Sequence, residues 1–551
     1  MTDIEIANSV QLRPIAEVAQ EAGFDEENVE LYGRYKAKIA AGECVPTGKL
    51  CLVTAINPTS LGEGKTTVAI GLTDGLRRIG CKVMAALREP SLGPVFGLKG
   101  GATGGGWAQV APMEDINLHF NGDLHAITAA NNLLAAMVDN HIFQGNERRI
   151  HPGKVLWRRC LDVNDRNLRS IVTGLGEEKN GLTMSSGFDI TAASEVMAIL
   201  CLAENLADLK ERLGNITVAY DVDGNPVYAR DIHAEGAMAA LLKEAVKPNL
   251  VQTLEGTPVL IHGGPFANIA HGCNSVIATK TALAHADYVV TEAGFGADLG
   301  AEKFVDVKCR SAGLSPSCIV LVATVKALKL AGGADKNALK EENFEALEKG
   351  LCNLGKHIEN ITGIFDVPCV VAINRYATDT GAELETVASF CQDYDVPAVS
   401  CDVWAKGGEG AEELAETVRD LMDGCDRKVR YTYPLEASAK EKIEAVVTRV
   451  YGGRGVIYTK KAEEDLRRIE KEGCGELPVI IAKTQYSLSD NPALLGRPEN
   501  FEVTIREVKP RTGAGFLVAV AGNMVLMPGL PKVPAADHID IDEQGNITGI
   551  F

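Results

Sequence analysis

The chain has 551 residues, of which 46 % are hydrophobic and 23 % charged, which is typical of a globular protein with more than one core. Its formal net charge of −19 argues against a general role in binding nucleic acid or a membrane surface. No apolar run reaches the roughly 18 residues that span a bilayer, and the first residues lack the pattern of a secretory signal. The fourteen cysteines are dispersed, which is typical of proteins in a reducing compartment. We therefore expect a cytoplasmic protein.

The N-terminal segment and the first strand come before an unusual turn. Residues 11–42 have a helical pattern broken near Gly23, which predicts a helical leader packed on the main body. The β-branched run Leu50–Ile56 predicts a buried strand, and a helical pattern starts at Val68. A glycine-rich turn between a strand and a helix N-terminus presents backbone N–H groups to a phosphate. We therefore expect a polyphosphate site at Thr59, Ser60, Leu61, Gly62, Glu63, Gly64, Lys65 and Thr66.

Two residues of this turn have specific roles in that interpretation. Lys65 reaches the outer phosphates, and the Thr66 hydroxyl holds Mg²⁺. The match to the usual pattern is incomplete because Thr59 stands where the first glycine is expected. The alternative is an ordinary glycine-rich turn with a solvated lysine.

A second predicted strand ends beside a candidate anion-binding arginine. Lys82–Leu87 predicts a strand parallel to the first, and Arg88 follows it directly. Ligands bind at the carboxyl ends of strands in open α/β sheets, so we expect Arg88 at the same mouth as Lys65. A guanidinium there can bind a carboxylate or phosphate through two hydrogen bonds. The alternative is a surface arginine paired with a carboxylate such as Glu89.

The segment from Arg88 to Asp123 is too rich in Gly and Pro for regular structure and too apolar for a disordered linker. Within it, residues 97–106 could wrap a ligand with backbone N–H groups, although glycine loops are common. Five polar residues further on could order a metal or protons but could equally be structural: Glu114, Asp115, His119, Asp123 and His125. Their spacing matches no zinc signature.

Strands and helices then alternate, which predicts an α/β fold with a mainly parallel sheet flanked by helices. A helix is expected at Ala126–Asn140, and strands at Ile216–Tyr220, Val259–His262, Tyr288–Glu292, Ile319–Ala323, Cys369–Asn374 and Pro478–Ala482, with another strand beginning at Phe516. We expect a P-loop-type nucleotide-binding domain at 1–360 and two smaller α/β domains, at 361–460 and at 461–551.

Further polar and aromatic residues follow these strands. Glu292 or Asp298 could orient Mg²⁺, although each could also be a turn residue. Tyr376 and Trp404 each follow a β run in a chain with only 5 % aromatic residues. Their rings could enclose a flat heterocycle, but the sequence alone favours partly buried core aromatics.

Several blocks in this order resemble the formate–tetrahydrofolate ligase family over nearly the whole chain. The blocks are TSLGEGKTT, REPSLGP with GLKGGATGGGW, PMEDINLHFNGD, HGGPFANIAHG, TEAGFGADLGAEKF, VATVKALKLAGG and PGLPKVPAA. The resemblance implies that ATP, formate and tetrahydrofolate give ADP, phosphate and 10-formyltetrahydrofolate through formyl phosphate. It also implies a homotetramer aided by Mg²⁺ and a monovalent cation, K⁺ or NH₄⁺. It places formate in the domain at 1–360 and makes 361–460 the folate-side domain. The net charge argues against a nucleic-acid or membrane partner.

The resemblance assigns site residues as well. It implies that Lys65 holds the transferring phosphate, that Arg88 holds formate or formyl phosphate, and that Tyr376 and Trp404 enclose the pterin. Several positions differ from the family pattern: Ser60 and Leu61 replace Pro-Ala, Thr103 and Trp107 replace Ala and Tyr, Lys326 replaces Arg, Ala331 replaces His or Asn, and Tyr376 stands where Phe can occur.

Two other hypotheses remain from the residues. One is a P-loop ATPase that switches the state of a partner, and the other is a different ATP-dependent ligase that activates a carboxylate. A switch protein needs no aromatic pterin slot, so Tyr376 and Trp404 are the features that separate it from the ligase.

Overall fold

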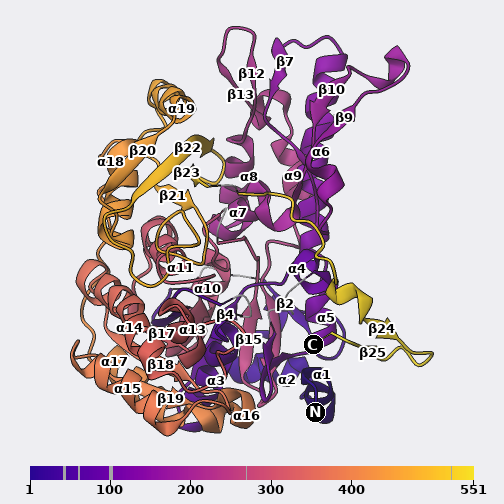
Figure 1. Cartoon of the computed structure of the whole chain (residues 1–551). Coiled ribbons are helices and arrows are strands. Elements are labelled where there is room, and N and C mark those ends of the chain that lie inside the picture. The colour runs from indigo at the N-terminus through magenta and orange to yellow at the C-terminus, as the bar shows by residue number, and fades with distance from the viewer. Residues whose placement is uncertain are drawn as a thin grey trace.

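One large mixed sheet runs through the computed structural model, which describes residues 1–40, 42, 45–59, 62–97, 103–267, 270–522 and 524–550 (Figure 1). Its main path has the order β1-β2-β14-β15-β4-β16-β3-β17-β18-β19. The parallel part comprises β15 (Pro258–Ile261), β4 (Val83–Leu87), β16 (Tyr288–Glu292), β3 (Lys49–Ala55), β17 (Pro316–Ala323), β18 (Cys369–Asn374) and β19 (Ala398–Cys401). The predicted α/β fold class is confirmed.

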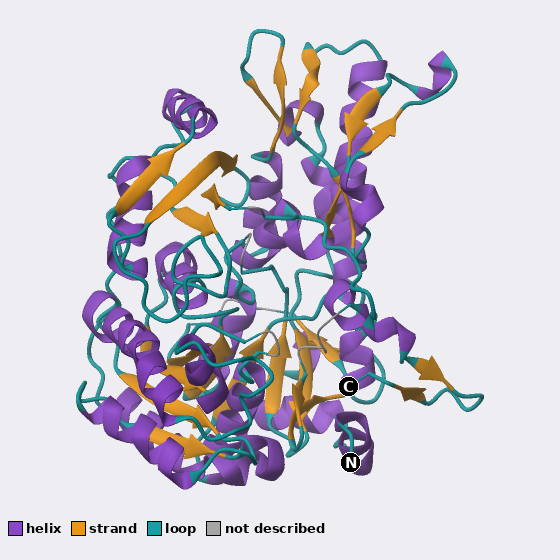
Figure 2. Cartoon of the chain, in the orientation of Figure 1, coloured by secondary structure: helices purple, strands orange, loops and turns teal. Residues whose placement is uncertain are grey.

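Helices cover both faces of the parallel strands, as Figure 2 shows. On one face lie α3 (Lys65–Arg78) and α17 (Glu412–Asp423); on the other lie α10 (Val276–His285), α13 (Val325–Ala331), α14 (Phe344–Glu359) and α15 (Gly381–Gln392). Successive residues of β3 point to opposite faces, so Leu52 packs with the second group and Val53 with the first. Burial on both faces explains why these strands are continuous apolar runs.

The N-terminal segment differs from the predicted helical leader. After α1 (Asp3–Ser9), α2 (Ile15–Ala22) ends at Gly23, whose φ of 85° is the left-handed conformation that favours glycine. The chain then forms β1 (Val29–Leu31) and β2 (Ala37–Ile39), which extend the large sheet through β14 (Asn249–Thr253). The prediction was wrong beyond Gly23 because two three-residue strands are stabilised by a partner more than 200 positions away.

The glycine-rich segment after β4 also contains more regular structure than the sequence predicts. It forms α4 (Leu92–Phe96), β5 (Gly104–Gly105), β6 (Ala108–Ala111) and α5 (Met113–Asn117). Strand β6 pairs with β14 and so belongs to the large sheet. Residues 98–102 of the predicted wrapping loop lie outside the described residues, as do Asn268 and Ile269 of the HGGPFANIAHG block.

A second body of structure rises above the large sheet at the right of Figure 1. It contains α6 (Asp123–Phe143), β7 (Ile150–Val155), β8 (Arg159–Leu161), β9 (Ile171–Thr173), β10 (Met184–Ser186), β11 (Phe188–Ile190), α7 (Glu195–Leu202), α8 (Leu206–Gly214), β12 (Thr217–Asp221), β13 (Pro226–Tyr228) and α9 (Glu235–Leu241). The predicted strand at Ile216–Tyr220 is β12, which pairs antiparallel with β7 and β13 and not with the parallel sheet.

The C-terminal residues form a smaller four-stranded sheet, orange and yellow in Figure 1. Its elements are α18 (Ala439–Ala445), β20 (Gly455–Tyr458), α19 (Lys460–Lys471), β21 (Val479–Ala482), β22 (Glu502–Arg511) and β23 (Phe516–Ala521). The last strands, β24 (Asp540–Ile541) and β25 (Ile547–Thr548), return to the N-terminus, where Ile550 packs with Ile4 and Ile6. The division into domains 1–360, 361–460 and 461–551 stays a prediction; β18 and β19, from its second part, pair within the large sheet.

Among the described helices, none combines the length and the apolar character required to cross a bilayer.

Candidate functional site

The turn between β3 and α3 has the geometry of an anion site. Gly64 is the N-cap of α3 with φ 72°, and Gly62 has φ 82°. A Cβ at Gly64 would lie 2.5 Å from the Asn374 amide nitrogen, so this position excludes a side chain. Lys65 and Thr66 open the helix, where backbone N–H groups lack intrahelical partners. Ser60 and Leu61 of the predicted ATP-binding stretch lie outside the described residues.

Glu63 holds this turn against two neighbouring strand ends. Its buried carboxylate accepts hydrogen bonds from the Thr59 backbone N–H at 2.6 Å and from the Thr324 hydroxyl. The Asn374 side chain donates to the Glu63 carbonyl at 3.1 Å. Burial raises the pKa of Glu63, and the hydrogen bonds from Thr324 and Thr59 oppose that rise. Thr324 follows β17 and Asn374 ends β18, so the turn is positioned by the sheet and not by its own glycines alone.

Glu292 connects the two parts of the site that the sequence places on separate strands. β3 and β4 are parallel, as predicted, but they are not neighbours, because β16 lies between them and ends at Glu292. The Thr66 hydroxyl donates to Glu292 Oε2 at 2.7 Å, and Arg88 Nε lies 3.4 Å from Glu292 Oε1. The Glu292 carboxylate is fully buried, whereas the Arg88 side chain is 21 % exposed. The carboxylate of Glu292 therefore contacts both Thr66, at the start of α3, and Arg88.

Arg88 occupies a narrow place at the end of β4. A Cβ at Gly294 would approach its Nη1 to 2.9 Å, so glycine leaves room for the guanidinium. The carboxylate beside Arg88 is Glu292 and not Glu89. Glu89 is buried, and its pKa lies well above the usual value because of burial and the nearby charge of Asp123.

Three of the other polar candidates, Asp115, Asp123 and Asp298, are paired with lysines. Asp123 forms a buried ion pair with Lys38 at 2.7 Å, and Asp115 pairs with Lys36 at 2.9 Å. Asp298, the alternative to Glu292 for Mg²⁺, pairs with buried Lys483 at 2.7 Å. In the described part of the chain, no group of three or more His, Cys, Asp or Glu side chains is placed to hold a metal ion.

The two aromatic candidates follow adjacent parallel strands, β18 and β19. Tyr376 is half-buried, and the Lys326 ammonium lies 3.6 Å from the centroid of its ring. Trp404, on the short helix α16 (Val403–Lys406), is 52 % exposed, which does not fit a core aromatic. The Trp404 carbonyl accepts a hydrogen bond from the Trp107 backbone N–H at 2.9 Å. Between the described residues, no contact of the Tyr376 ring with the Trp404 ring occurs.

The structure adds residues that sequence reasoning missed. Thr324 and Asn374 fix the turn through Glu63, and Lys326 covers one face of Tyr376. The only sequence signal for Thr324 and Asn374 is that each is a polar residue at the end of an apolar strand. Of the departures from the family pattern, Thr103 is buried and accepts a hydrogen bond from Asn117 at 3.2 Å, which gives it a structural role.

Comparison with protein families gives one match. The model of the formate–tetrahydrofolate ligase family matches residues 1–551, the whole length of the chain. Every element described above, from the turn before α3 to the C-terminal sheet, lies within that match.

Proposed function

The chain belongs to the formate–tetrahydrofolate ligase family, whose members are ATP-dependent ligases, and from this premise we propose how its residues carry out the reaction. In the proposal, ATP phosphorylates formate to formyl phosphate at the edge where β3, β16 and β4 end, and tetrahydrofolate then attacks the formyl carbon. The observation that carries the proposal is the buried Glu292 carboxylate, which contacts both Thr66 and Arg88.

The ATP phosphates bind at the start of α3, in the stretch Thr59–Thr66. The first backbone N–H groups of α3 and the helix dipole favour negative charge there, and Lys65 stabilises the phosphoryl group in transfer. The Thr66 hydroxyl and the Glu292 carboxylate are oxygen donors 2.7 Å apart, a set that suits Mg²⁺. When bound there, Mg²⁺ would neutralise phosphate charge. Asp298 is already paired with Lys483, so we assign the role of Mg²⁺ ligand to Glu292.

Arg88 holds formate and then formyl phosphate. Its planar guanidinium can bind a carboxylate through two parallel hydrogen bonds. The reaction must bring formate close to ATP although both are anions, so cations on either side of β16 offset their repulsion. Fixed positioning of the two reactants removes a further part of the barrier.

The pterin of tetrahydrofolate binds beside Tyr376 and Trp404. Trp404 presents a large exposed ring, and its backbone is anchored by Trp107. Tyr376 follows the neighbouring strand, and Lys326 covers one face of its ring. In the proposal, the pterin stacks on the opposite face. Stacking on aromatic rings suits a planar heterocycle.

The chemical steps balance without an additional reactant. A formate oxygen attacks the γ-phosphorus, and ADP leaves. The folate N10 then attacks the carbonyl carbon of formyl phosphate, loses its proton, and releases phosphate. That phosphate keeps the bridging oxygen that came from formate.

Isotope transfer tests this route directly. With [¹⁸O]formate, ATP and tetrahydrofolate, we expect one ¹⁸O atom in each phosphate released, measured by mass spectrometry. Phosphate without label would contradict a formyl phosphate intermediate.

The dependence of ADP release on the substrates distinguishes the ligase from a nucleotide-driven switch protein. We expect full ADP release only when formate and tetrahydrofolate are both present. Equal ADP release with neither would support a P-loop ATPase switch, and release with other small acids in place of formate would support a different carboxylate-activating ligase. Family membership favours the formate ligase. The monovalent cation, the homotetramer and the cytoplasmic location remain parts of the proposal.

A further inference from the structure

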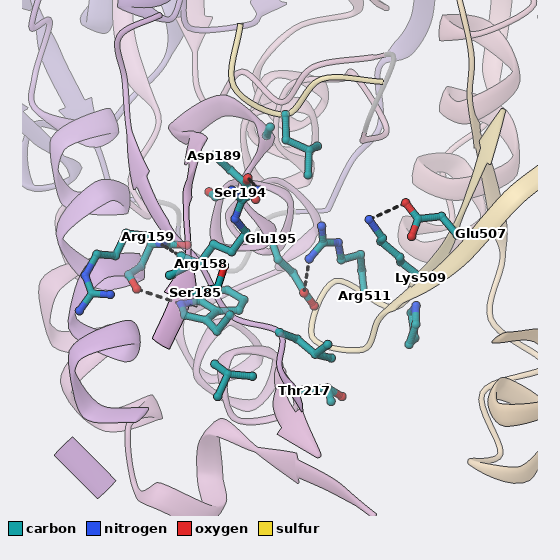
Figure 3. Close-up of a pocket in the computed structure, with 18 of the residues that line it drawn as sticks. Arg158, Arg159, Ser185, Asp189, Ser194, Glu195, Thr217, Glu507, Lys509 and Arg511 are labelled. Atoms are coloured by element: carbon teal, nitrogen blue, oxygen red, sulfur yellow. Dashed lines mark hydrogen bonds and ion pairs between the residues drawn. The ribbon is translucent and has the colours of Figure 1, made fainter. Parts of the chain in front are cut away.

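A cavity of about 590 Å³ lies apart from the proposed reaction site (Figure 3). One wall comes from residues 155–195, and the opposite wall comes from the end of β22, which carries Lys509 and Arg511. Its volume falls within the range of roughly 300–1,000 Å³ that is usual for small-molecule sites. None of the residues proposed to bind ATP, formate or folate lines this cavity.

The segment after β15 contacts both the neighbour of Arg88 and the cavity wall. Gly264 in this loop packs against the Glu89 carbonyl, where a Cβ would come within 2.0 Å. Two residues later, the Phe266 backbone N–H donates to the Ala192 carbonyl at 3.1 Å, and Ala193 lines the cavity. Residues 264–266 therefore link the residue after Arg88 to the residue before Ala193 in the cavity lining.

The cavity is locally positive in an acidic protein. Seven Lys or Arg residues line it against five Asp or Glu residues, whereas the whole chain has a net charge of −19. Charges from both walls act on one partly buried carboxylate that lines the cavity. Burial raises the pKa of Asp189, and the positive charges of Arg158, Arg511 and Lys509 oppose that rise.

Two guanidinium groups on opposite walls retain donors for a ligand. Arg511 Nη1 lies 3.6 Å from Glu195 Oε2, beyond direct hydrogen-bond distance, while Glu195 Oε1 accepts from the Gly513 backbone N–H at 2.8 Å. Arg169 donates its Nε to the Met527 carbonyl at 2.9 Å and has no carboxylate within ion-pair distance in the described part of the chain. Its terminal nitrogens are thus not committed to an acid.

The remaining lining suits an oxygen-rich molecule. Residues with hydroxyl groups also line the cavity, among them Ser170, Ser185, Ser186 and Ser194 of the first wall and Thr217 of β12. Hydroxyls donate and accept hydrogen bonds, whereas guanidinium groups only donate and favour carboxylate or phosphate oxygens.

We infer that this cavity binds a small dianion or trianion whose acidic groups bridge Arg169 on one wall and Arg511 on the other. The ligand class is a polycarboxylate or a diphosphate-like molecule, and its binding ties residues 155–195 to the C-terminal sheet. This site is additional to the sites for ATP, formate and folate.

Isothermal titration of the full chain with citrate and with inorganic pyrophosphate, at constant ionic strength, tests the inference. We expect saturable binding of at least one probe with a millimolar or lower Kd, and a Kd about tenfold or more higher in Arg511→Gln and in Arg169→Gln. Binding of citrate alone identifies a carboxylate ligand, and binding of pyrophosphate alone identifies a phosphate ligand.

Two control variants separate this cavity from other anion sites. Pyrophosphate can also enter the proposed ATP site, so both probes are titrated into Lys65→Ala, where cavity binding should persist. Arg454→Gln removes an exposed arginine paired with Glu502 on the same C-terminal sheet and should leave both affinities unchanged. Absence of binding by both probes, or binding that survives Arg511→Gln but not Lys65→Ala, would overturn the inference without bearing on the ligase reaction.

Discussion

At the residue scale, Lys65 is the group on which phosphoryl transfer depends most directly. It opens α3 beside Thr66, whose hydroxyl contacts Glu292. We expect Lys65→Ala to lower kcat about 10²- to 10³-fold or more, the usual effect of removing one group that stabilises transition-state charge. Lys336→Ala, at an exposed lysine, is the matched control. Circular dichroism should show an unchanged fold, and near-normal turnover in Lys65→Ala would refute the assigned role.

Trp404 provides a separate test of the folate position. Its side chain is 52 % exposed, so truncation removes little packing within the chain. We expect Trp404→Ala to weaken tetrahydrofolate binding by about 1–3 kcal/mol, the scale of one lost stack on a flat base. Trp107→Ala is the control, because Trp107 contacts Trp404 through a backbone N–H that the variant retains. We expect Trp107→Ala to change the free energy of tetrahydrofolate binding by less than about 0.5 kcal/mol. Equal folate affinities in wild type and Trp404→Ala, measured by fluorescence titration, would remove Trp404 from the site.

Lys326 acts through Tyr376 rather than on the substrate. Its ammonium lies 3.6 Å from the ring centroid, a cation–π contact worth about 0.5–2 kcal/mol that keeps one ring face covered. Loss of that cation–π free energy corresponds to a Kd for tetrahydrofolate about 2- to 30-fold higher in Lys326→Met. We expect the Kd for ATP to stay unchanged in this variant. Lys326→Arg retains the cation and should restore most of the affinity. If the Met and Arg variants bind folate equally well, the contact has no positioning role.

At the scale of elements, helix α3 is held at both ends. Its N-terminus carries the phosphate turn, and Asp74 further along it accepts hydrogen bonds from the Thr253 and Thr257 hydroxyls, which flank the β14–β15 connection. Burial raises the pKa of Asp74 from 3.8 to about 7, and those hydrogen bonds oppose the rise. The folded state therefore binds a proton that the unfolded state has already lost at pH 5–7.

Because Asp74 holds this proton in the folded state, its contribution to the stability of the protein depends on pH. A folded pKa above the unfolded value means that the Asp74 contribution to stability is present at pH 4 and is lost as the pH rises through about 7. The slope is at most about 1.4 kcal/mol per pH unit in this window. We expect wild type to lose more stability than Asp74→Asn between pH 5.0 and 7.5, measured by urea denaturation. Parallel pH profiles would show that Asp74 does not titrate in this range.

The elements also show what the sequence could and could not predict. The bounds of β16 and β18 match the predicted strands because each apolar run ends at a polar residue, Glu292 or Asn374. The position of β16 between β3 and β4 could not be read from the chain, because strand order depends on partners distant in sequence. For the same reason β12 was assigned to the parallel sheet, and Glu292 and Asp298 remained alternatives for orienting Mg²⁺.

The candidate site was predicted in part for a related reason. Lys65 and Arg88 each follow a recognisable strand, so their placement at one sheet edge was expected from topology alone. The contact of Thr66 and Arg88 with one carboxylate was not predicted. Thr324 and Lys326 contribute through contacts with Glu63 and Tyr376 that cross from one strand end to another. Such contacts depend on side-chain placement, for which no local pattern exists.

At the scale of the whole molecule, a buried polar joint connects the C-terminal residues to the large sheet. Lys483, just after β21, pairs with Asp298 at 2.7 Å, and both side chains are fully buried. The Asn57 side chain donates to the other Asp298 oxygen at 3.2 Å, two residues before the phosphate turn begins at Thr59. The joint therefore links the C-terminal sheet, the segment after β16 and the end of β3.

Breaking one side of this joint should cost more than removing the pair. We expect Lys483→Met to destabilise the protein by about 3–5 kcal/mol, because it leaves the Asp298 charge buried without its partner. The double variant Lys483→Met/Asp298→Asn removes that charge as well and should recover a large part of the loss. Arg454→Met, which breaks the exposed pair with Glu502, should cost at most about 1 kcal/mol. The test compares the denaturant midpoints of wild type, Lys483→Met, the double variant and Arg454→Met. If the double variant is no more stable than Lys483→Met, the loss of stability comes from packing around the lysine side chain. The buried charge of Asp298 is then not its cause.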